Sequence, residues 1–169
     1  MGRGNSEFRR VRRRCAARVR ELSLPQPFDA HALCRAVAVQ RGREIRVLPM
    51  EGGDSGVLGL WVATEQADLI CYEANTTPPH QEHIILHELC HLLCNHYPAQ
   101  LSTTEHMRML MPDLDPRMVQ RILGRTSYGA AEEHEAELMA TLIRQAASPG
   151  SADSVAGKIN EAFDWPGHG

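Results

Sequence analysis

Residues 80–97 read HQEHIILHELCHLLCNHY and contain the pattern His-Glu-x-x-His at positions 87–91. Residues four apart lie on the same face of an α-helix, so the imidazoles of His87 and His91 can reach one metal ion. Glu88 is displaced from His87 by about 100° around the helix axis. From there its carboxylate can approach a water molecule bound to the metal and act as a general base.

The apolar residues of the same stretch favour one amphipathic helix. With His87 at 0° and 100° per residue, His91 falls at about 40° and His83 at about 320°. Leucine and isoleucine side chains occupy the opposite arc, from about 140° to 260°. These are Ile85, Leu86, Leu89, Leu92 and Leu93. One face of the helix is therefore expected in the protein core, and the other in a metal site.

Bulk composition sets limits on the class of protein. A chain of 169 residues with 43% apolar residues is expected to form a single folded domain. No apolar run reaches the roughly 18 residues of a membrane span, and no apolar segment of a secretory signal follows the basic N-terminus. Five cysteines without regular spacing are not a disulfide framework, which favours a reducing cytoplasm.

The chain divides into three parts by its sequence pattern. Residues 1–24 are predicted to form a basic N-terminal helix or arm, residues 25–148 the folded domain, and residues 149–169 a flexible tail. Eight arginines lie in residues 1–20. They indicate a solvated helix face, or alternatively an arm that contacts nucleic acid or an acidic partner. With a net charge of −3 and no recognised DNA-binding motif, direct contact with nucleic acid is not expected.

Residue periodicity predicts an α+β fold. Strands are expected at 45–50, 57–63 and 67–73, with the last two forming a hairpin in a small, mostly antiparallel sheet. Besides the central helix, helices are expected at residues 6–23, 29–41, 117–123 and 130–147. Asp29 is a suitable N-cap for the second of these and Gly42 a suitable C-cap.

A catalytic zinc site needs a third protein ligand. A third histidine ten residues after the first would be one solution, but that position is Tyr97. The remaining source is the acidic cluster of the helix at 130–147. On its helical wheel Glu133 lies beside small alanines that would let the two helices approach, so Glu133 is the predicted ligand and Glu135 the runner-up. Glu137, one turn further on, is expected to form a hydrogen bond with a ligating histidine without binding the metal itself.

Several other residues near the motif have two interpretations. Cys90 and Cys94 flank the histidine pair and are interpreted as small buried residues, although a thiolate ligand is the alternative. His96 falls on the leucine arc and is expected at the helix C-terminus, facing solvent or interacting with the helix dipole. His83 and His134 are expected at the surface.

These segments resemble the ImmA/IrrE family of small zinc metallopeptidases. The resemblance rests on residues 81–91, QEHIILHELCH, and residues 133–140, EHEAELMA, and it extends over about residues 28–147. It implies a minimal zincin-like fold in which a small twisted sheet packs on the His-Glu-x-x-His helix and on a second, ligand-bearing helix. It also implies that His87, His91 and Glu133 bind zinc and that Glu88 is the catalytic base.

The same resemblance implies a substrate. Members of the family typically cleave or antagonise a helix-turn-helix repressor, and some act in toxin–antitoxin pairs. We therefore expect a zinc-dependent endopeptidase that cleaves such a regulator or antitoxin. Strand 67–73, as an edge strand, could align the substrate by strand addition, and Tyr72 or His83 could assist at the oxyanion. The alternative is a catalytically silent module on the same scaffold that regulates its partner by association alone.

Overall fold

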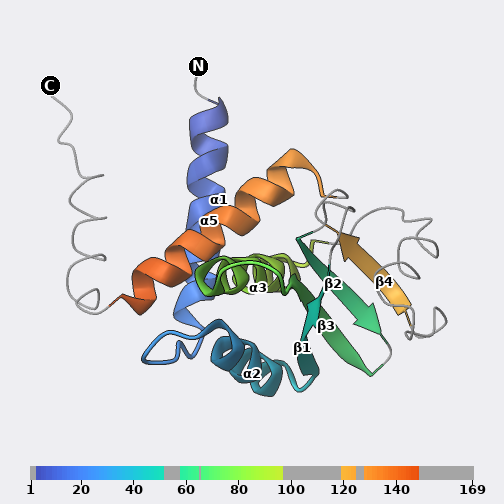
Figure 1. Ribbon diagram of the computed structural model, residues 1–169. Coiled ribbons are helices and arrows are strands. Elements are labelled where there is room, and N and C mark those ends of the chain that lie inside the picture. The colour runs from blue at the N-terminus through green and yellow to red at the C-terminus, as the bar shows by residue number, and fades with distance from the viewer. Residues whose placement is uncertain (1–2, 52–57, 65, 97–118, 125–127, 149–169) are drawn as a thin grey trace, which may run out of the picture.

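The computed structural model describes residues 3–51, 58–64, 66–96, 119–124 and 128–148, and it has the α+β class predicted from the sequence (Figure 1). The predicted tail at 149–169 lies outside these residues. The described helices are α1 (Arg3–Arg20), α2 (Ala30–Arg41), α3 (Pro78–Cys94) and α5 (Ala130–Ala147). The strands are β1 (Glu44–Met50), β2 (Gly59–Thr64), β3 (Ala67–Glu73) and β4 (Val119–Gly124). None of the described helices is both long and apolar enough to cross a membrane.

The four strands form a mixed sheet in the order β1-β3-β2-β4. β2 pairs antiparallel with β3, which confirms the predicted hairpin, and β2 also pairs antiparallel with β4. β1 runs parallel to β3. Strand β3 is therefore interior, and the prediction that residues 67–73 form an edge strand is wrong. Among the described strands the edges are β1 and β4, because β1 pairs with the side of β3 that β2 leaves open.

The prediction of a helix at 117–123 is also wrong, because residues 119–124 form strand β4. A run of six residues is too short for periodicity to distinguish a helix from a strand. Backbone pairing with β2 settles the outcome, since Leu60 to Thr64 face this segment in antiparallel register. Long-range pairing of this kind is invisible in a local sequence window.

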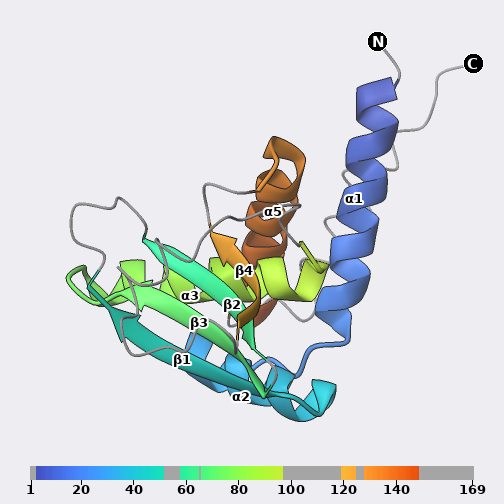
Figure 2. The ribbon, with the colours of Figure 1, turned by 90° about the vertical axis from the view of Figure 1, so that its right-hand side faces the viewer.

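Helix α3 lies at the centre of the molecule. It packs on β2 and β3 on one side and on α5 on the other, while α2 covers β1 (Figure 2). Pro78 and Pro79 start the helix, where a missing backbone N–H does no harm. Asn95 ends it in the left-handed conformation, with φ of 55°. Of the leucine and isoleucine face that the helical wheel predicts, four side chains are buried in the hydrophobic core and Leu93 is partly buried against it. The four are Ile85, Leu86, Leu89 and Leu92.

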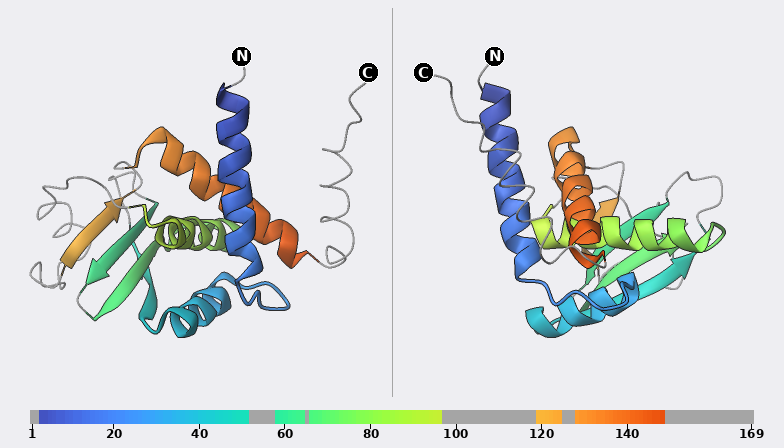
Figure 3. Two further views of the ribbon diagram at one scale, coloured as in Figure 1. Left: turned by 180° about the vertical axis from the view of Figure 1, so that it is seen from behind. Right: turned by 90° about the vertical axis from the view of Figure 1, so that its left-hand side faces the viewer.

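Helix α1 packs against α5 and crosses it near its middle (Figure 3). Its exposed side carries arginines, and its inner side buries Cys15 and Val19 in the same core that holds α3 and α5. The division of the chain at residue 24 stays a prediction. In the described part of α1, however, Cys15 and Val19 belong to the same hydrophobic core as the folded domain.

The remaining boundaries follow local sequence signals. Asp29 caps α2 by accepting a hydrogen bond from the backbone N–H of Ala32, and Gly42 ends the helix with φ of 62°, a left-handed conformation that favours glycine. At the start of β3, the buried Asp68 carboxylate accepts hydrogen bonds from Arg43 Nε at 3.0 Å and from the Trp61 indole at 3.2 Å. These contacts compensate for burying the charge.

Candidate metal centre

Three of the predicted site residues converge where α3 meets the first turn of α5. His87 Nε2 lies 2.9 Å from His91 Nε2 and 3.3 Å from Glu133 Oε2. His91 Nε2 lies 3.8 Å from Glu133 Oε1. Both imidazoles are fully buried and the carboxylate is partly exposed. The helix spacing of four residues brings the two rings together, and the packing of α5 on α3 adds the carboxylate.

The spacing of these atoms fits a metal ion. Ligand atoms about 2.1 Å from a tetrahedral zinc are roughly 3.4 Å apart, and the three measured separations lie on both sides of that value. Two imidazoles and one carboxylate leave the fourth position of a tetrahedral ion open. The residues are therefore compatible with a metal ion that keeps one coordination position for a water or substrate.

The runner-up, Glu135, faces elsewhere. Its carboxylate binds Arg14 of α1 and contacts His96, so it is not part of the cluster around His87 and His91. Glu132 has a structural role, because its Oε2 accepts a hydrogen bond of 2.9 Å from the backbone N–H of Gly129 at the start of α5. Of the acidic cluster, Glu133 alone is grouped with the two histidines among the described residues.

Glu137 lies where the sequence places it, one turn after Glu133. Its Oε1 is 3.1 Å from His87 Nδ1 and 3.8 Å from His83 Nε2. A carboxylate at the far nitrogen of a ligating histidine favours the tautomer whose other nitrogen is free to bind metal. His83 is partly exposed at the rim of the site, and His134 is exposed.

Tyr128 is a site residue that the sequence analysis missed. Its ring stacks on the His91 imidazole, with a centroid separation of 3.5 Å and an interplanar angle of 8°. The side chain is buried, and burial together with the charges of Glu88 and Glu133 raises the pKa of its hydroxyl. A single tyrosine between a short strand and a helix carries no sequence pattern that would assign it to the site.

His96 lies at the C-terminal end of α3 as expected, but the expectation that it faces solvent is wrong. The side chain is 5% exposed and its Nδ1 lies 3.0 Å from His91 Nδ1. The helical wheel fails because α3 ends at Cys94, and the left-handed Asn95 turns the chain back. The backbone N–H of His96 then donates to the carbonyl of His91. The His96 ring therefore contacts the Nδ1 side of His91, while the Nε2 of His91 faces His87.

Glu88 is 1% exposed and lies against strand β2. A Cβ atom added to Gly59 would lie 2.6 Å from Glu88 Oε1 and 2.6 Å from Ile84 Cγ2. The absence of a side chain at Gly59 thus makes room for the carboxylate. The sequence signal was a glycine inside a strand pattern, which is typical of a close approach by another group.

The cysteines of α3 do not join the histidine pair. Cys90 is fully buried in the hydrophobic core, and burial raises the pKa of its thiol well above the ordinary value. Cys94 Sγ contacts Met139 Sδ at 3.4 Å, facing α5 and Cys15 of α1. Both are small buried residues, as predicted. Tyr72, proposed for the oxyanion, packs its ring edge-on against His31 of α2.

A His-Glu-x-x-His helix, with a glutamate from a second helix beside the histidine pair, defines the chain as a candidate metalloprotein of the metallopeptidase type. Comparison with known families supports this class: residues 40–109 match a peptidase family described as the IrrE N-terminal-like domain. The match places this segment in the ImmA/IrrE-like family and confirms the resemblance found in the sequence. Glu133 lies beyond the matched segment. Searches of curated proteins and of solved structures gave no significant match.

Proposed function

We propose that the protein is a zinc-dependent endopeptidase with a zincin-like arrangement of the site. The observation that carries the proposal is the convergence of His87 Nε2, His91 Nε2 and a Glu133 oxygen within 4.8 Å of one another. A buried glutamate, Glu88, follows the first of these histidines in the sequence. The family match at residues 40–109 supports peptide-bond hydrolysis as the reaction class.

The donor set favours zinc. Imidazole nitrogens suit zinc and other transition metals, whereas magnesium and calcium take oxygen ligands. In the proposed site His87, His91 and Glu133 hold the ion. Zinc bound there supplies a Lewis acid that lowers the pKa of a coordinated water and polarises the substrate carbonyl.

Glu88 moves the proton in this proposal. Its carboxylate accepts the proton of the attacking water and then delivers it to the leaving amine. Gly59 allows the carboxylate to pack closely against β2, so that its position is held by the sheet. Tyr128 and Glu137 orient the two histidines, the first by stacking on His91 and the second from the Nδ1 side of His87.

For the substrate we propose a helix-turn-helix regulator or antitoxin, which the family resemblance supports. A segment of that partner would bind in extended form along an edge of the sheet. Since β3 is interior, β4 takes the place first given to residues 67–73. Its partner strand β2 begins at Gly59, next to Glu88, so an extended peptide paired with β4 would lie two strand spacings, about 10 Å, from β2.

The test compares Glu88→Gln with Glu82→Gln, the same substitution on the same helix. Zinc content is measured by inductively coupled plasma mass spectrometry. Hydrolysis is followed by mass-spectrometric detection of new N-termini in a peptide library and in candidate helix-turn-helix regulators. We expect one zinc per chain in both variants, and loss of cleavage only in Glu88→Gln.

Cleavage by zinc-loaded Glu88→Gln at the wild-type rate would refute the mechanism. A wild-type protein that binds zinc and forms a stable complex with the regulator, without cutting it, would instead indicate a silent binding module.

A further inference from the structure

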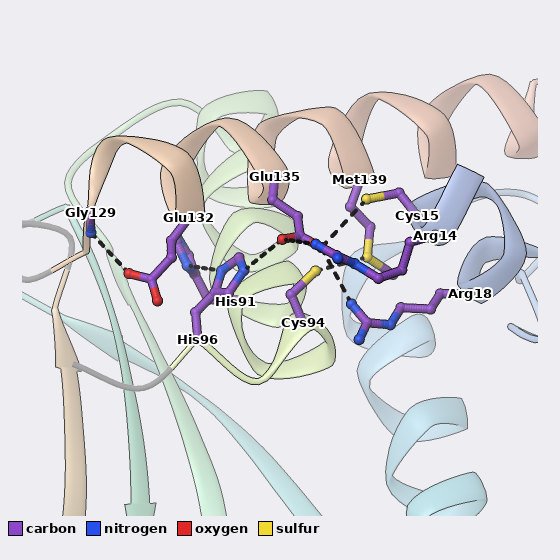
Figure 4. Close-up of polar contacts among 10 residues, drawn as sticks. All are labelled: Arg14, Cys15, Arg18, His91, Cys94, His96, Gly129, Glu132, Glu135 and Met139. Atoms are coloured by element: carbon purple, nitrogen blue, oxygen red, sulfur yellow. Dashed lines mark hydrogen bonds and ion pairs between the residues drawn. The ribbon is translucent and has the colours of Figure 1, made fainter. Parts of the chain in front are cut away.

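A chain of polar contacts runs from the proposed zinc ligand His91 to the N-terminal helix (Figure 4). His91 Nδ1 lies 3.0 Å from His96 Nδ1, and His96 Nε2 lies 3.4 Å from Glu135 Oε2. Glu135 in turn accepts hydrogen bonds from Arg14 of α1. Three separate segments thus meet behind the metal-facing side of His91: α1, the turn after α3, and α5.

The direction of the hydrogen bonds follows from the position of His91. Its Nε2 points at His87 Nε2 and Glu133, so a ligating His91 needs its lone pair at Nε2 and its proton at Nδ1. That proton is donated to His96 Nδ1, which must then be the unprotonated nitrogen of its ring. His96 therefore carries its proton on Nε2, directed toward Glu135. One arrangement of protons satisfies the whole chain.

The end of the chain is charged and mostly buried. The Glu135 side chain is 11% exposed. Arg14 donates to Glu135 Oε1 from Nε at 3.0 Å, and from Nη2 to both carboxylate oxygens at 2.7 Å. Arg18 Nη1 lies 3.5 Å from Oε1. A buried carboxylate without such partners is costly, so α1 supplies the positive charge that allows Glu135 to stay ionised beside His96.

A second metal site is the competing interpretation of the same residues. Cys94, His96 and Glu135 have ligand atoms within 4.8 Å of one another. However, both Glu135 oxygens already accept hydrogen bonds from Arg14, and two guanidinium groups lie close to the carboxylate. A cation placed there would be repelled by both arginines. The observations therefore favour the hydrogen-bonded chain.

We propose that His96 is a positioning residue for the metal site, and that Glu135 with Arg14 of α1 holds it in place. Helix α1 would then be part of the metal centre, although it contributes no ligand. The inference rests on the proposed function to the extent that His91 binds zinc. It assigns to the basic N-terminal helix a role in metal affinity, which its arginine-rich sequence does not suggest.

The test measures zinc affinity of the full chain by competition with a chromogenic chelator. His96→Leu removes the acceptor for His91, and His96→Asn, which has nearly the shape of leucine, restores an acceptor oxygen. Loss of an outer partner of a metal-binding histidine typically weakens binding about 10–100-fold, and we expect this for His96→Leu. His96→Asn should recover most of that loss, which a purely structural role would not predict.

A second pair of variants tests the helix. Arg14→Gln should weaken zinc binding, whereas Arg13→Gln, a neighbouring exposed arginine on the same helix, should not. Circular dichroism and thermal unfolding of the metal-free variants establish that they fold. If the His96 variants do not fold, the arginine pair decides the outcome.

Equal zinc affinity of wild type, folded His96→Leu and Arg14→Gln would overturn the proposal while leaving the proposed zinc site intact. Two zinc ions in wild type and one in His96→Leu would overturn it in favour of a second metal site. A wild-type protein that binds no zinc would refute the proposed function itself, and with it the positioning role of His96.

Discussion

Gly59 on β2 is the position where one added methyl group tests the placement of Glu88. In Gly59→Ala the new Cβ would lie 2.6 Å from Glu88 Oε1 and 2.6 Å from Ile84 Cγ2. Both neighbours must withdraw by about 0.8 Å to reach ordinary contact distance. Both are almost fully buried, so neither can move into solvent. Overpacking of this size typically lowers the free energy of unfolding by about 1–3 kcal/mol.

The effect on catalysis is expected to be larger than the effect on folding. A displacement of a catalytic group by about 1 Å can reduce the rate about 100-fold. The atoms nearest to the added Cβ belong to Glu88 and Ile84 and not to the proposed zinc ligands, so the zinc content should stay at one per chain. The assay combines urea unfolding, zinc analysis and the rate of appearance of new N-termini from a peptide library.

The matched control is Gly129→Ala. The nearest atom to its added Cβ is Glu132 Oε2 at 3.7 Å, an ordinary contact. This variant should change the free energy of unfolding by no more than about 1 kcal/mol, since alanine is only a poorer N-cap. If Gly59→Ala unfolds and cleaves as wild type does, Glu88 is not held against β2 in the way described.

Three further predictions concern other parts of the molecule. Burial raises the thiol pKa of Cys34 and Cys71 to about 12, so iodoacetamide at pH 8.5 should modify them only after denaturation. Their modification should become faster as the pH rises toward 12, and mass spectrometry of native and denatured protein measures both effects. Asp68→Ala removes the buried carboxylate that accepts from the Trp61 indole and from Arg43 Nε, and it should lower the free energy of unfolding by about 2–3 kcal/mol. Glu44→Ala, in an exposed ion pair, should leave the unfolding midpoint in urea unchanged. Tyr128→Ala should weaken zinc binding about tenfold in the chelator assay and Tyr128→Phe should not, because only the first removes the stacked ring.

Local sequence signals located most of the regular structure. The pattern of residues 130–147 and the short, largely apolar run at residues 67–73 predicted α5 and β3 with the bounds observed. Asp29 and Gly42 predicted the ends of α2 within a residue. Each of these signals acts within one or two turns, or within one strand, so a short window contains all the information required.

The errors share a physical cause. Strand β4 forms by pairing with residues about sixty positions earlier, and β3 is interior because β1 comes in beside it. His96 was misplaced because the wheel was continued past Asn95, where the helix had ended. In each case the outcome depends on a contact or a backbone turn that periodicity does not record.

The sequence by itself determined that a helix within residues 80–97 presents His87, Glu88 and His91 on the side opposite a leucine face, because a helix turns by a constant angle per residue. The sequence also limited the candidates for the third metal ligand to the acidic cluster of the helix at residues 130–147. Only the tertiary structure shows that Glu133, and not Glu135, lies beside the two histidines, since this depends on how α5 and α1 pack around α3. The same packing brought Tyr128, Gly59 and His96 to the site, because contacts between distant segments arise only when the chain has folded.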